Sequence, residues 1–290
     1  MQLFYKEYGD GIPVVILHGL FGFSDNWKSQ AKVLANYFRV IVVDLRNHGR
    51  SEWDEIHNYE TMADDVIETM DSLELAEFHV IGHSMGGKVA MHLAQSYPAR
   101  LLKTIVVDMG VKSYPMHHQD LIEAIKAVPL DTISARSQVN TFLSDRIPEE
   151  GVRQFLLKNL YWIERGKLAW RMNIAVLEAN MRSILNALPE IEVLSPTLFI
   201  KGADSNYILW SRSYAKKENM KVYERNNYVL LAGNCFKNWK KDGVGLHMTP
   251  CYSARGVHRC ANKLEYLWVF GNDVFATVGG AVFVEHVSKS

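Results

Sequence analysis

The sequence predicts an α/β protein: a mostly parallel sheet covered by helices, with an inserted and largely helical lid. Residues 1–110 alternate short β-branched runs with stretches of helical periodicity, which is typical of parallel strands joined by crossover helices. Residues 111–190 contain several helical patterns in succession, and an apolar run at residues 197–200 then resumes the sheet. We therefore expect a core formed by residues 1–110 and 191–290, and a lid formed by residues 111–190.

The individual elements follow from the spacing of apolar residues. Short continuous apolar runs are typical of strands buried on both faces, whereas apolar residues at three- and four-residue steps indicate helices. These patterns predict strands at residues 3–8, 14–17, 40–43, 78–81, 104–107 and 197–200, and core helices at residues 27–36, 59–73 and 86–96. In the lid they predict helices at residues 121–128, 139–143, 151–160 and 174–188, and a hairpin formed by residues 161–164 and 167–171.

Length and charge exclude several classes of protein. The chain has 290 residues, which fits one large α/β domain with room for a lid. Its formal net charge is zero, which argues against a nucleic-acid partner because binding nucleic acid requires a basic surface. No apolar run approaches the roughly 18 residues of a membrane span, and Lys6 and Glu7 interrupt the apolar stretch that a signal peptide needs. We expect a soluble, cytoplasmic protein.

Metal and disulfide chemistry have little support in the sequence. The three cysteines, Cys235, Cys251 and Cys260, are too few for a disulfide framework, and their spacings match no common zinc finger. His117 and His118 are adjacent, so their side chains would diverge, and we expect both to lie on the surface of the lid. The sequence therefore predicts neither a metal site nor a cofactor.

The strongest functional signal is the sequence Gly-His-Ser-Met-Gly at residues 82–86, between a predicted strand and a predicted helix. This is the context of a nucleophile elbow, in which small residues allow a tight turn that exposes the serine. The helix N-terminus beneath Ser84 favours negative charge that develops there. The alternative is a chance match in a loop, but the strand before it and the helix after it favour Ser84 as a nucleophile.

A second signal is the sequence His-Gly-Leu-Phe-Gly at residues 18–22, directly after the predicted strand at residues 14–17. Acyl transfer needs two donors aimed at the oxyanion. The backbone N–H of Met85, the residue after the nucleophile, can supply one of them. The N–H of Leu20 can supply the other, because the flanking glycines let the backbone approach closely. The alternative is an ordinary β–α turn, and we expect His18 to be structural.

Four segments carry a more specific pattern. They are Val-Asp-Leu-Arg-Asn-His-Gly-Arg-Ser at residues 43–51, Gly-His-Ser-Met-Gly-Gly-Lys at residues 82–88, Glu-Gly-Val-Arg-Gln-Phe-Leu-Leu-Lys-Asn at residues 150–159, and Leu-Phe-Ile-Lys-Gly-Ala-Asp-Ser-Asn-Tyr-Ile at residues 198–208. Together they resemble the small bacterial serine esterases and acyl-CoA thioesterases of the alpha/beta-hydrolase superfamily, over residues 1–208. The resemblance implies an alpha/beta-hydrolase fold and a lidded enzyme. It also implies hydrolysis of short- to medium-chain acyl esters or acyl-CoA thioesters without a cofactor.

Two aspartates after Ser84 end predicted strands, Asp108 and Asp204. The acid of a catalytic triad orients the histidine and stabilises the imidazolium. In many alpha/beta-hydrolases the acid follows the later strand, which favours Asp204. In the esterases that the chain resembles, the acid ends the strand just after the nucleophile helix, which is the position of Asp108. We prefer Asp108 and keep Asp204 as the alternative acid.

The catalytic histidine is missing from the position that the resemblance implies. The family carries Gly-x-Gly-His-Trp at a position that corresponds to residues 231–235, where this chain has no histidine. His247, His258 and His286 lie further on, and residues 243–250 look most like the family's histidine loop. His247 is therefore our candidate, with His258 and His286 as weaker ones, and the absence of any catalytic histidine is the alternative.

The composition also changes near residue 206. Residues 1–205 hold 20 Lys and Arg against 26 Asp and Glu, whereas residues 206–290 hold 12 against 6. This stretch offers possible strands at residues 222–223, 228–231, 266–270 and 281–284, but no closing helix. Three hypotheses follow: a serine hydrolase of acyl esters or thioesters, a catalytically impaired hydrolase fold that binds a small acyl or lactone-like ligand, or a chain whose C-terminal part is read in a shifted frame.

Overall fold

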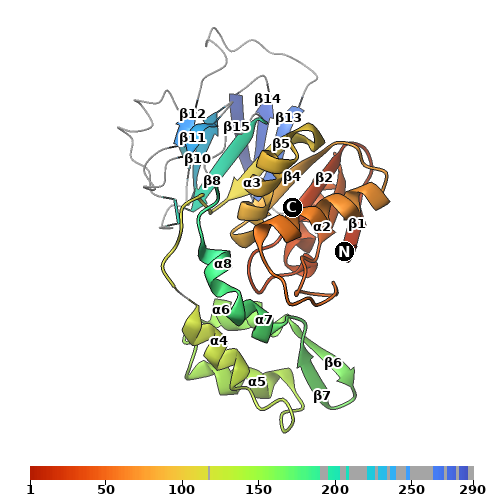
Figure 1. Ribbon diagram of the computed structural model, residues 1–290, viewed down its shortest axis with the longest axis vertical. Helices are drawn as coiled ribbons and strands as arrows, with labels where there is room; N and C mark the ends of the chain where they lie inside the picture. Colours follow the sequence, from red (N-terminus) through yellow and green to blue (C-terminus); the bar gives the residue numbers. More distant parts are fainter. Residues whose placement is uncertain are drawn as a thin grey trace.

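The computed structural model describes residues 1–116, 118–189, 195–202 and 207–208, together with seven separate strands between residues 221 and 286 (Figure 1). For residues 201–202 and for those seven strands it describes the backbone only. Asp204 and His258 lie outside the described residues, as do the three cysteines.

A sheet of eight strands forms the centre of the fold. In spatial order its strands are β1 (Tyr5–Tyr8), β3 (Arg39–Val43), β2 (Pro13–Leu17), β4 (Phe78–His83), β5 (Leu101–Val107), β8 (Thr197–Gly202), β10 (Tyr228–Gly233) and β9 (Lys221–Arg225). The five strands from β3 to β8 in this order are parallel, and β1 pairs antiparallel with β3 at one edge. At the other edge β10 pairs antiparallel with both β8 and β9. The mostly parallel sheet that the sequence predicts is confirmed.

Helices cover both faces of this sheet. Successive strand residues point to opposite faces, so apolar residues in a continuous run need a helix layer on each side. They are η1 (Ser24–Trp27), α1 (Lys28–Leu34), α2 (Tyr59–Ser72), α3 (Met85–Ser96) and the short η2 (Pro98–Arg100). Ile16 of β2 belongs to the core cluster that contains Leu34 of α1. The next residue, Leu17, belongs instead to the cluster that contains Met62 of α2 and Val89 of α3. The central strands are therefore buried on both sides.

Residues 111–189, which we call the insertion, lie below the sheet in Figure 1. The insertion consists of α4 (Gln119–Lys126), α5 (Arg136–Ser144), α6 (Glu150–Leu157), β6 (Leu160–Glu164), β7 (Lys167–Trp170), α7 (Ile174–Ala179) and α8 (Met181–Leu185). The single helix that we predicted at residues 174–188 is wrong, because Asn180 divides it. The Asn180 carboxamide donates to the carbonyls of Val176, at 2.9 Å, and Glu55, at 3.2 Å. Side-chain bonds of this kind compete with the helical pattern.

Two buried side chains tie the end of the insertion to α2 and α3. The Tyr59 hydroxyl donates to the carbonyl of Ile184, and the Lys88 ammonium donates to the carbonyl of Asn186. Burial lowers the pKa of Lys88 to about 7. The rings of Tyr59 and Tyr114 lie 5.5 and 5.0 Å from its nitrogen, where cation–π attraction offsets part of the cost of burying the charge. The insertion is thus fixed to the helix that follows Ser84.

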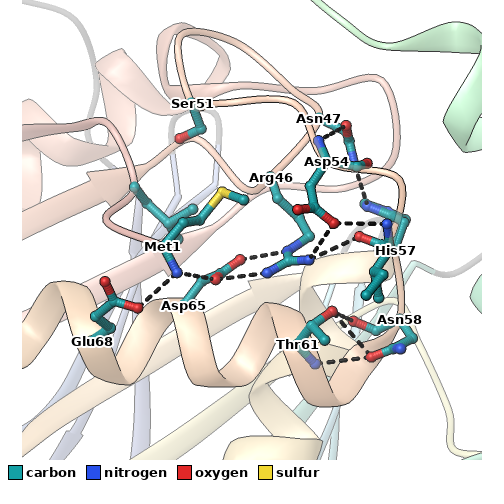
Figure 2. Close-up of polar contacts among 12 residues, drawn as sticks. Met1, Arg46, Asn47, Ser51, Asp54, His57, Asn58, Thr61, Asp65 and Glu68 are labelled. Carbon is teal, nitrogen blue, oxygen red and sulfur yellow. Dashed lines mark hydrogen bonds and ion pairs between the residues drawn. The ribbon is translucent and has the colours of Figure 1, made fainter.

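An ion-pair network fixes the loop between β3 and α2 (Figure 2). The Arg46 guanidinium donates from Nε and Nη2 to both carboxylate oxygens of Asp65, at 2.6 and 2.8 Å, and both side chains are buried. Arg46 also donates to the carbonyl of Ile56 at 2.8 Å, and the ammonium of Met1 lies 2.7 Å from Asp65 Oδ1. Bidentate pairs are among the more rigid polar contacts. They hold in place the loop that carries His48.

Beyond residue 208 the regular elements that the structure describes are all strands. β11 (Phe236–Trp239) pairs with β12 (Leu246–Met248), and β13 (Leu264–Phe270), β14 (Asp273–Val278) and β15 (Ala281–His286) form an antiparallel sheet. The four strands that we predicted in this stretch lie within β9, β10, β13 and β15, whereas β11, β12 and β14 were not predicted. Among the described helices, none combines the length and the apolar character that crossing a bilayer requires.

Candidate active site

Ser84 occupies the turn between β4 and α3. Its backbone dihedrals are φ 53° and ψ −119°, a strained conformation that costs a non-glycine residue on the order of 1–3 kcal/mol. The Ser84 N–H donates to the carbonyl of Val107 on β5 at 3.0 Å. Gly86 is required beneath this turn, because a Cβ there would lie 2.4 Å from the carbonyl oxygen of Leu17. The surrounding backbone therefore holds Ser84 in a geometry that few residues adopt freely.

The turn at residues 18–22 lies directly against Ser84. A Cβ on Gly19 would stand 3.1 Å from the Ser84 Cβ, so a larger residue there would require its neighbours to shift. Within the described part of the chain, neither the Leu20 N–H nor the Met85 N–H meets a hydrogen-bond acceptor. Met85 is the first residue of α3, where backbone N–H groups have no acceptor in the helix. Two backbone donors are thus available beside the serine.

Two buried histidines make hydrogen bonds that hold the turn at residues 18–22. His18 accepts the Leu45 N–H at Nε2, at 2.9 Å, and its Nδ1 lies 2.8 Å from the Gly19 carbonyl oxygen. His48 accepts the Phe21 N–H at Nε2, at 3.2 Å. An imidazole that accepts at one nitrogen and donates at the other is neutral. Burial lowers the pKa of His18 to about 4 and that of His48 to about 3, so both stay neutral and serve as scaffold.

Asp108 directly follows β5, the strand next to β4, and lines the same cavity as Ser84. Its φ is 52°, and its N–H donates to the carbonyl of Ile200 on β8 at 2.7 Å. Burial lowers the pKa of the neighbouring His83, and the negative charge of Asp108 opposes that shift. The structure therefore brings Ser84 and Asp108 to the same end of adjacent parallel strands.

The other residues that we predicted for a triad are not placed. Asp204 and His258 fall among the residues that the structure leaves undescribed. His247 lies in β12 and His286 ends β15, two strands of which only the backbone is described. The assignment of His247 as the base, and of Asp204 as the alternative acid, stays a prediction.

A cavity of about 480 Å³ opens beside Ser84. The core contributes Leu20, Trp27, Ser84 and Asp108 to its wall, and the insertion contributes Leu121, Val152, Phe155 and Leu156. A cavity of this size, lined mainly by apolar side chains with a few polar groups, is typical of a small-molecule site. In the described residues no cluster of His, Cys, Asp or Glu is arranged to hold a metal ion.

His118, which is partly exposed, also lines this cavity, whereas His117 lies outside the described residues. His118 precedes α4 in the left-handed conformation, with φ 71°, and its ring meets the Phe21 ring edge-on at 6.2 Å between centroids. Non-glycine residues rarely adopt positive φ unless tertiary packing holds them there. The sequence around residue 118 therefore gives no signal of the direction in which this side chain points.

Comparison with known proteins agrees with this geometry. The profile of the alpha/beta hydrolase fold matches residues 12–145. Esterase YbfF of Escherichia coli (strain K12) is 37% identical over 199 residues, which cover 68% of this chain and 76% of that protein. The chain belongs to the alpha/beta hydrolase fold family. The resemblance that we inferred from its motifs is thereby confirmed.

Two further relatives of this hydrolase-fold chain add detail. The sn-1-specific diacylglycerol lipase ABHD11 of Danio rerio is 37% identical over 210 residues, covering 69% of this chain and 66% of that protein. A solved structure described as a marine microorganism esterase superposes with a TM-score of 0.70 at 38% identity, covering 72% of this chain and 83% of that one. Esterases and a lipase are thus the kinds of protein to which this chain is similar.

Proposed function

We propose that this chain cleaves short- to medium-chain acyl esters or acyl-CoA thioesters through an acyl-enzyme on Ser84. Its family and its esterase and lipase relatives make it a hydrolase of the esterase/lipase type. The finer proposal is carried by one observation: Ser84 lies in a strained turn, flanked by the backbone N–H groups of Leu20 and Met85, which have no acceptor among the described residues. That combination serves the attack of a serine on a carbonyl carbon.

The Leu20 N–H is aimed by its own peptide unit. The Gly19 carbonyl and the Leu20 N–H belong to one trans peptide, in which the two groups point in opposite directions. Because the Gly19 carbonyl oxygen bonds to His18, the Leu20 N–H points away from that ring. As Ser84 Oγ bonds to the acyl carbon, the carbonyl oxygen gains negative charge, which the Leu20 and Met85 N–H groups stabilise.

The proton transfers require a histidine, and His247 is the candidate. In the proposed cycle its imidazole takes the proton from Ser84 Oγ and gives it to the leaving alkoxide or thiolate. A water molecule then attacks the acyl carbon of the acyl-enzyme and loses a proton to the same imidazole. The bond between the acyl carbon and Ser84 Oγ breaks, the imidazolium returns the proton to Ser84 Oγ, and the carboxylic acid is released. Asp108, at the end of the strand beside the nucleophile, orients the imidazole and stabilises its cationic form.

The shape of the cavity suggests the acyl group as its occupant. Leu121, Phe155 and Leu156 of the insertion contribute apolar side chains to the wall of the cavity that Leu20 and Ser84 also line. An acyl chain gains free energy in proportion to the apolar area that it buries there. The polar leaving group would then lie toward solvent, which suits both an alcohol and a thiol.

The substrate class is tested by turnover of matched esters and thioesters. We expect the purified protein to hydrolyse p-nitrophenyl butyrate and butyryl-CoA, with kcat/KM rising from acetyl to butyryl and hexanoyl groups because of apolar burial. No hydrolysis above the uncatalysed rate with any of these substrates would contradict the proposed function.

The acid is tested by neutralising each aspartate in turn. Asp108→Asn should lower kcat by about 10⁴-fold, because an amide no longer holds the histidine in the correct tautomer. Asp204→Asn is the matched control and should leave kcat within a few-fold of the wild type. If Asp204→Asn proves the more damaging change, the acid follows the later strand and Asp108 is a strand-end carboxylate.

A further inference from the structure

One side chain joins the insertion directly to the turn that carries the Leu20 donor. Asn159 follows α6 and is completely buried. Its Nδ2 donates to the carbonyl oxygen of Phe21 at 2.7 Å, across 138 positions of sequence. This contact connects the wall of the cavity that the insertion forms with the backbone beside Ser84.

Phe21 is the strained residue of that turn. Its φ is +60°, in the left-handed region that non-glycine residues adopt only where neighbouring groups hold them. Both polar groups of its backbone are held: His48 accepts the N–H at 3.2 Å, and Asn159 donates to the carbonyl. The Gly22 N–H closes the turn onto the Gly19 carbonyl at 2.9 Å.

Asn159 is itself held firmly within the insertion. Its N–H donates to the carbonyl of Leu156, and its carbonyl accepts the Arg171 N–H, both at 2.9 Å. Its Oδ1 is buried, and among the described residues it has no hydrogen-bond partner. A buried amide that satisfies only one end costs stability, so an apolar residue would suit this place better if packing alone mattered. The Nδ2 bond to Phe21 is what the amide provides here.

We propose that Asn159 is a positioning residue that holds the 18–22 turn in its catalytic geometry, so that docking of the insertion also completes the oxyanion hole. The proposal rests on the proposed serine hydrolase function. Oxyanion donors act through preorganisation, and a donor that must reorient during the reaction loses much of its effect. Without the Asn159 bond, His48 alone still holds the backbone of the strained Phe21 by a hydrogen bond. A shift of Phe21 then moves the Gly22 N–H away from the Gly19 carbonyl, which belongs to the same peptide as the Leu20 N–H.

The first test compares two asparagines that link the insertion to the core. Asn159→Leu should lower kcat by about 10²-fold with little change in KM, because the substrate still binds but the oxyanion donor is misplaced. The affinity for a trifluoromethyl ketone, which forms a tetrahedral oxyanion on the serine, should fall in parallel. Asn180→Leu is the control: Asn180 also donates from the insertion to a core carbonyl, that of Glu55, far along the chain from the turn.

The second test uses pH and holds even if Asn159→Leu does not fold. Asn159→Asp keeps the shape, and its buried carboxyl, whose pKa is raised by desolvation, can donate to the Phe21 carbonyl only when protonated. We expect the ratio of its kcat/KM to that of the wild type to rise as the pH falls through that pKa. The folded fraction of the variant is measured by circular dichroism at each pH, because a buried charge also destabilises the fold. Once the rates are corrected for that fraction, a residue with a merely structural role would give a ratio independent of pH.

The outcomes separate this inference from the proposed function. If the wild type hydrolyses esters but Asn159→Leu and Asn180→Leu change kcat equally, or the Asn159→Asp ratio is flat with pH, Asn159 does not position the turn. If the wild type neither hydrolyses esters nor reacts with the ketone, the proposed function fails, and this inference fails with it.

Discussion

Ser84→Ala should lower kcat for p-nitrophenyl butyrate by about 10⁶-fold, to the residual rate that oxyanion donors and binding provide. The reason is that alanine removes the oxygen that forms the acyl-enzyme while the strained turn and the cavity remain. The measurement is steady-state hydrolysis by the purified variant, corrected for the uncatalysed rate.

The matched control for Ser84→Ala is Ser96→Ala, at the far end of the same helix α3. Ser96 is remote in sequence from the turn, and its hydroxyl contacts only the His92 ring among the described residues. This control should hydrolyse the ester at the wild-type rate. Equal activities of Ser84→Ala and Ser96→Ala would exclude Ser84 as the nucleophile.

His247→Ala should be nearly as damaging as Ser84→Ala, because serine and histidine act as one unit and losing either abolishes the activated nucleophile. His258→Ala, a nearby histidine flanked by Arg255 and Arg259, is the matched control and should retain activity. The measurement is again kcat with p-nitrophenyl butyrate.

The result with His247 also decides between the hypotheses that the sequence left open. A wild type that hydrolyses the ester robustly, and loses this activity in His247→Ala, has a displaced but complete triad. A wild type that is weak and unaffected by His247→Ala has an incomplete triad, and residues 206–290 are then not a functional family C-terminus. Translating the adjacent DNA in the other frames then separates the two remaining hypotheses. A Gly-x-Gly-His-Trp segment in another frame indicates a shifted frame, and its absence favours an impaired hydrolase fold that binds a ligand.

The parts of the site that the sequence predicts are those set by local spacing. The order strand, Gly-x-Ser-x-Gly, helix places Ser84 in its turn without reference to distant residues, and the structure shows φ 53° at that position. Predicting the place of Asp108 requires one further inference, that its strand is the parallel neighbour of the strand before Ser84. Neighbouring parallel strands end at the same edge of a sheet, which brings the two residues together. The glycines at residues 19 and 86 belong to the same short motifs, but the close approach that they allow is between segments far apart in the sequence.

The parts that the sequence does not predict depend on contacts between distant segments. Asn159 meets Phe21 across 138 positions of sequence, and nothing in the motif around residue 159 distinguishes it from a surface amide. His118 lines the cavity because of a left-handed backbone that tertiary packing imposes. The break at Asn180 arises from a bond to Glu55, which the periodicity of residues 174–188 cannot reveal.

The C-terminal edge of the sheet shows the same limit. The β-branched and aromatic residues of β9 and β10 predict strands, but not their direction, because both parallel and antiparallel neighbours bury such residues. The structure pairs β10 antiparallel with β8, in a sheet whose preceding strands from β3 to β8 are parallel.

The most direct test of Ser84 as the nucleophile is reaction with a fluorophosphonate, followed by mass spectrometry of the labelled peptide. The fluorophosphonate phosphorus bonds to the serine oxygen and releases fluoride, so the adduct marks the residue that attacks. The account predicts one adduct per chain, on Ser84, and none in Ser84→Ala. Labelling at another residue, or labelling that persists in Ser84→Ala, would contradict it.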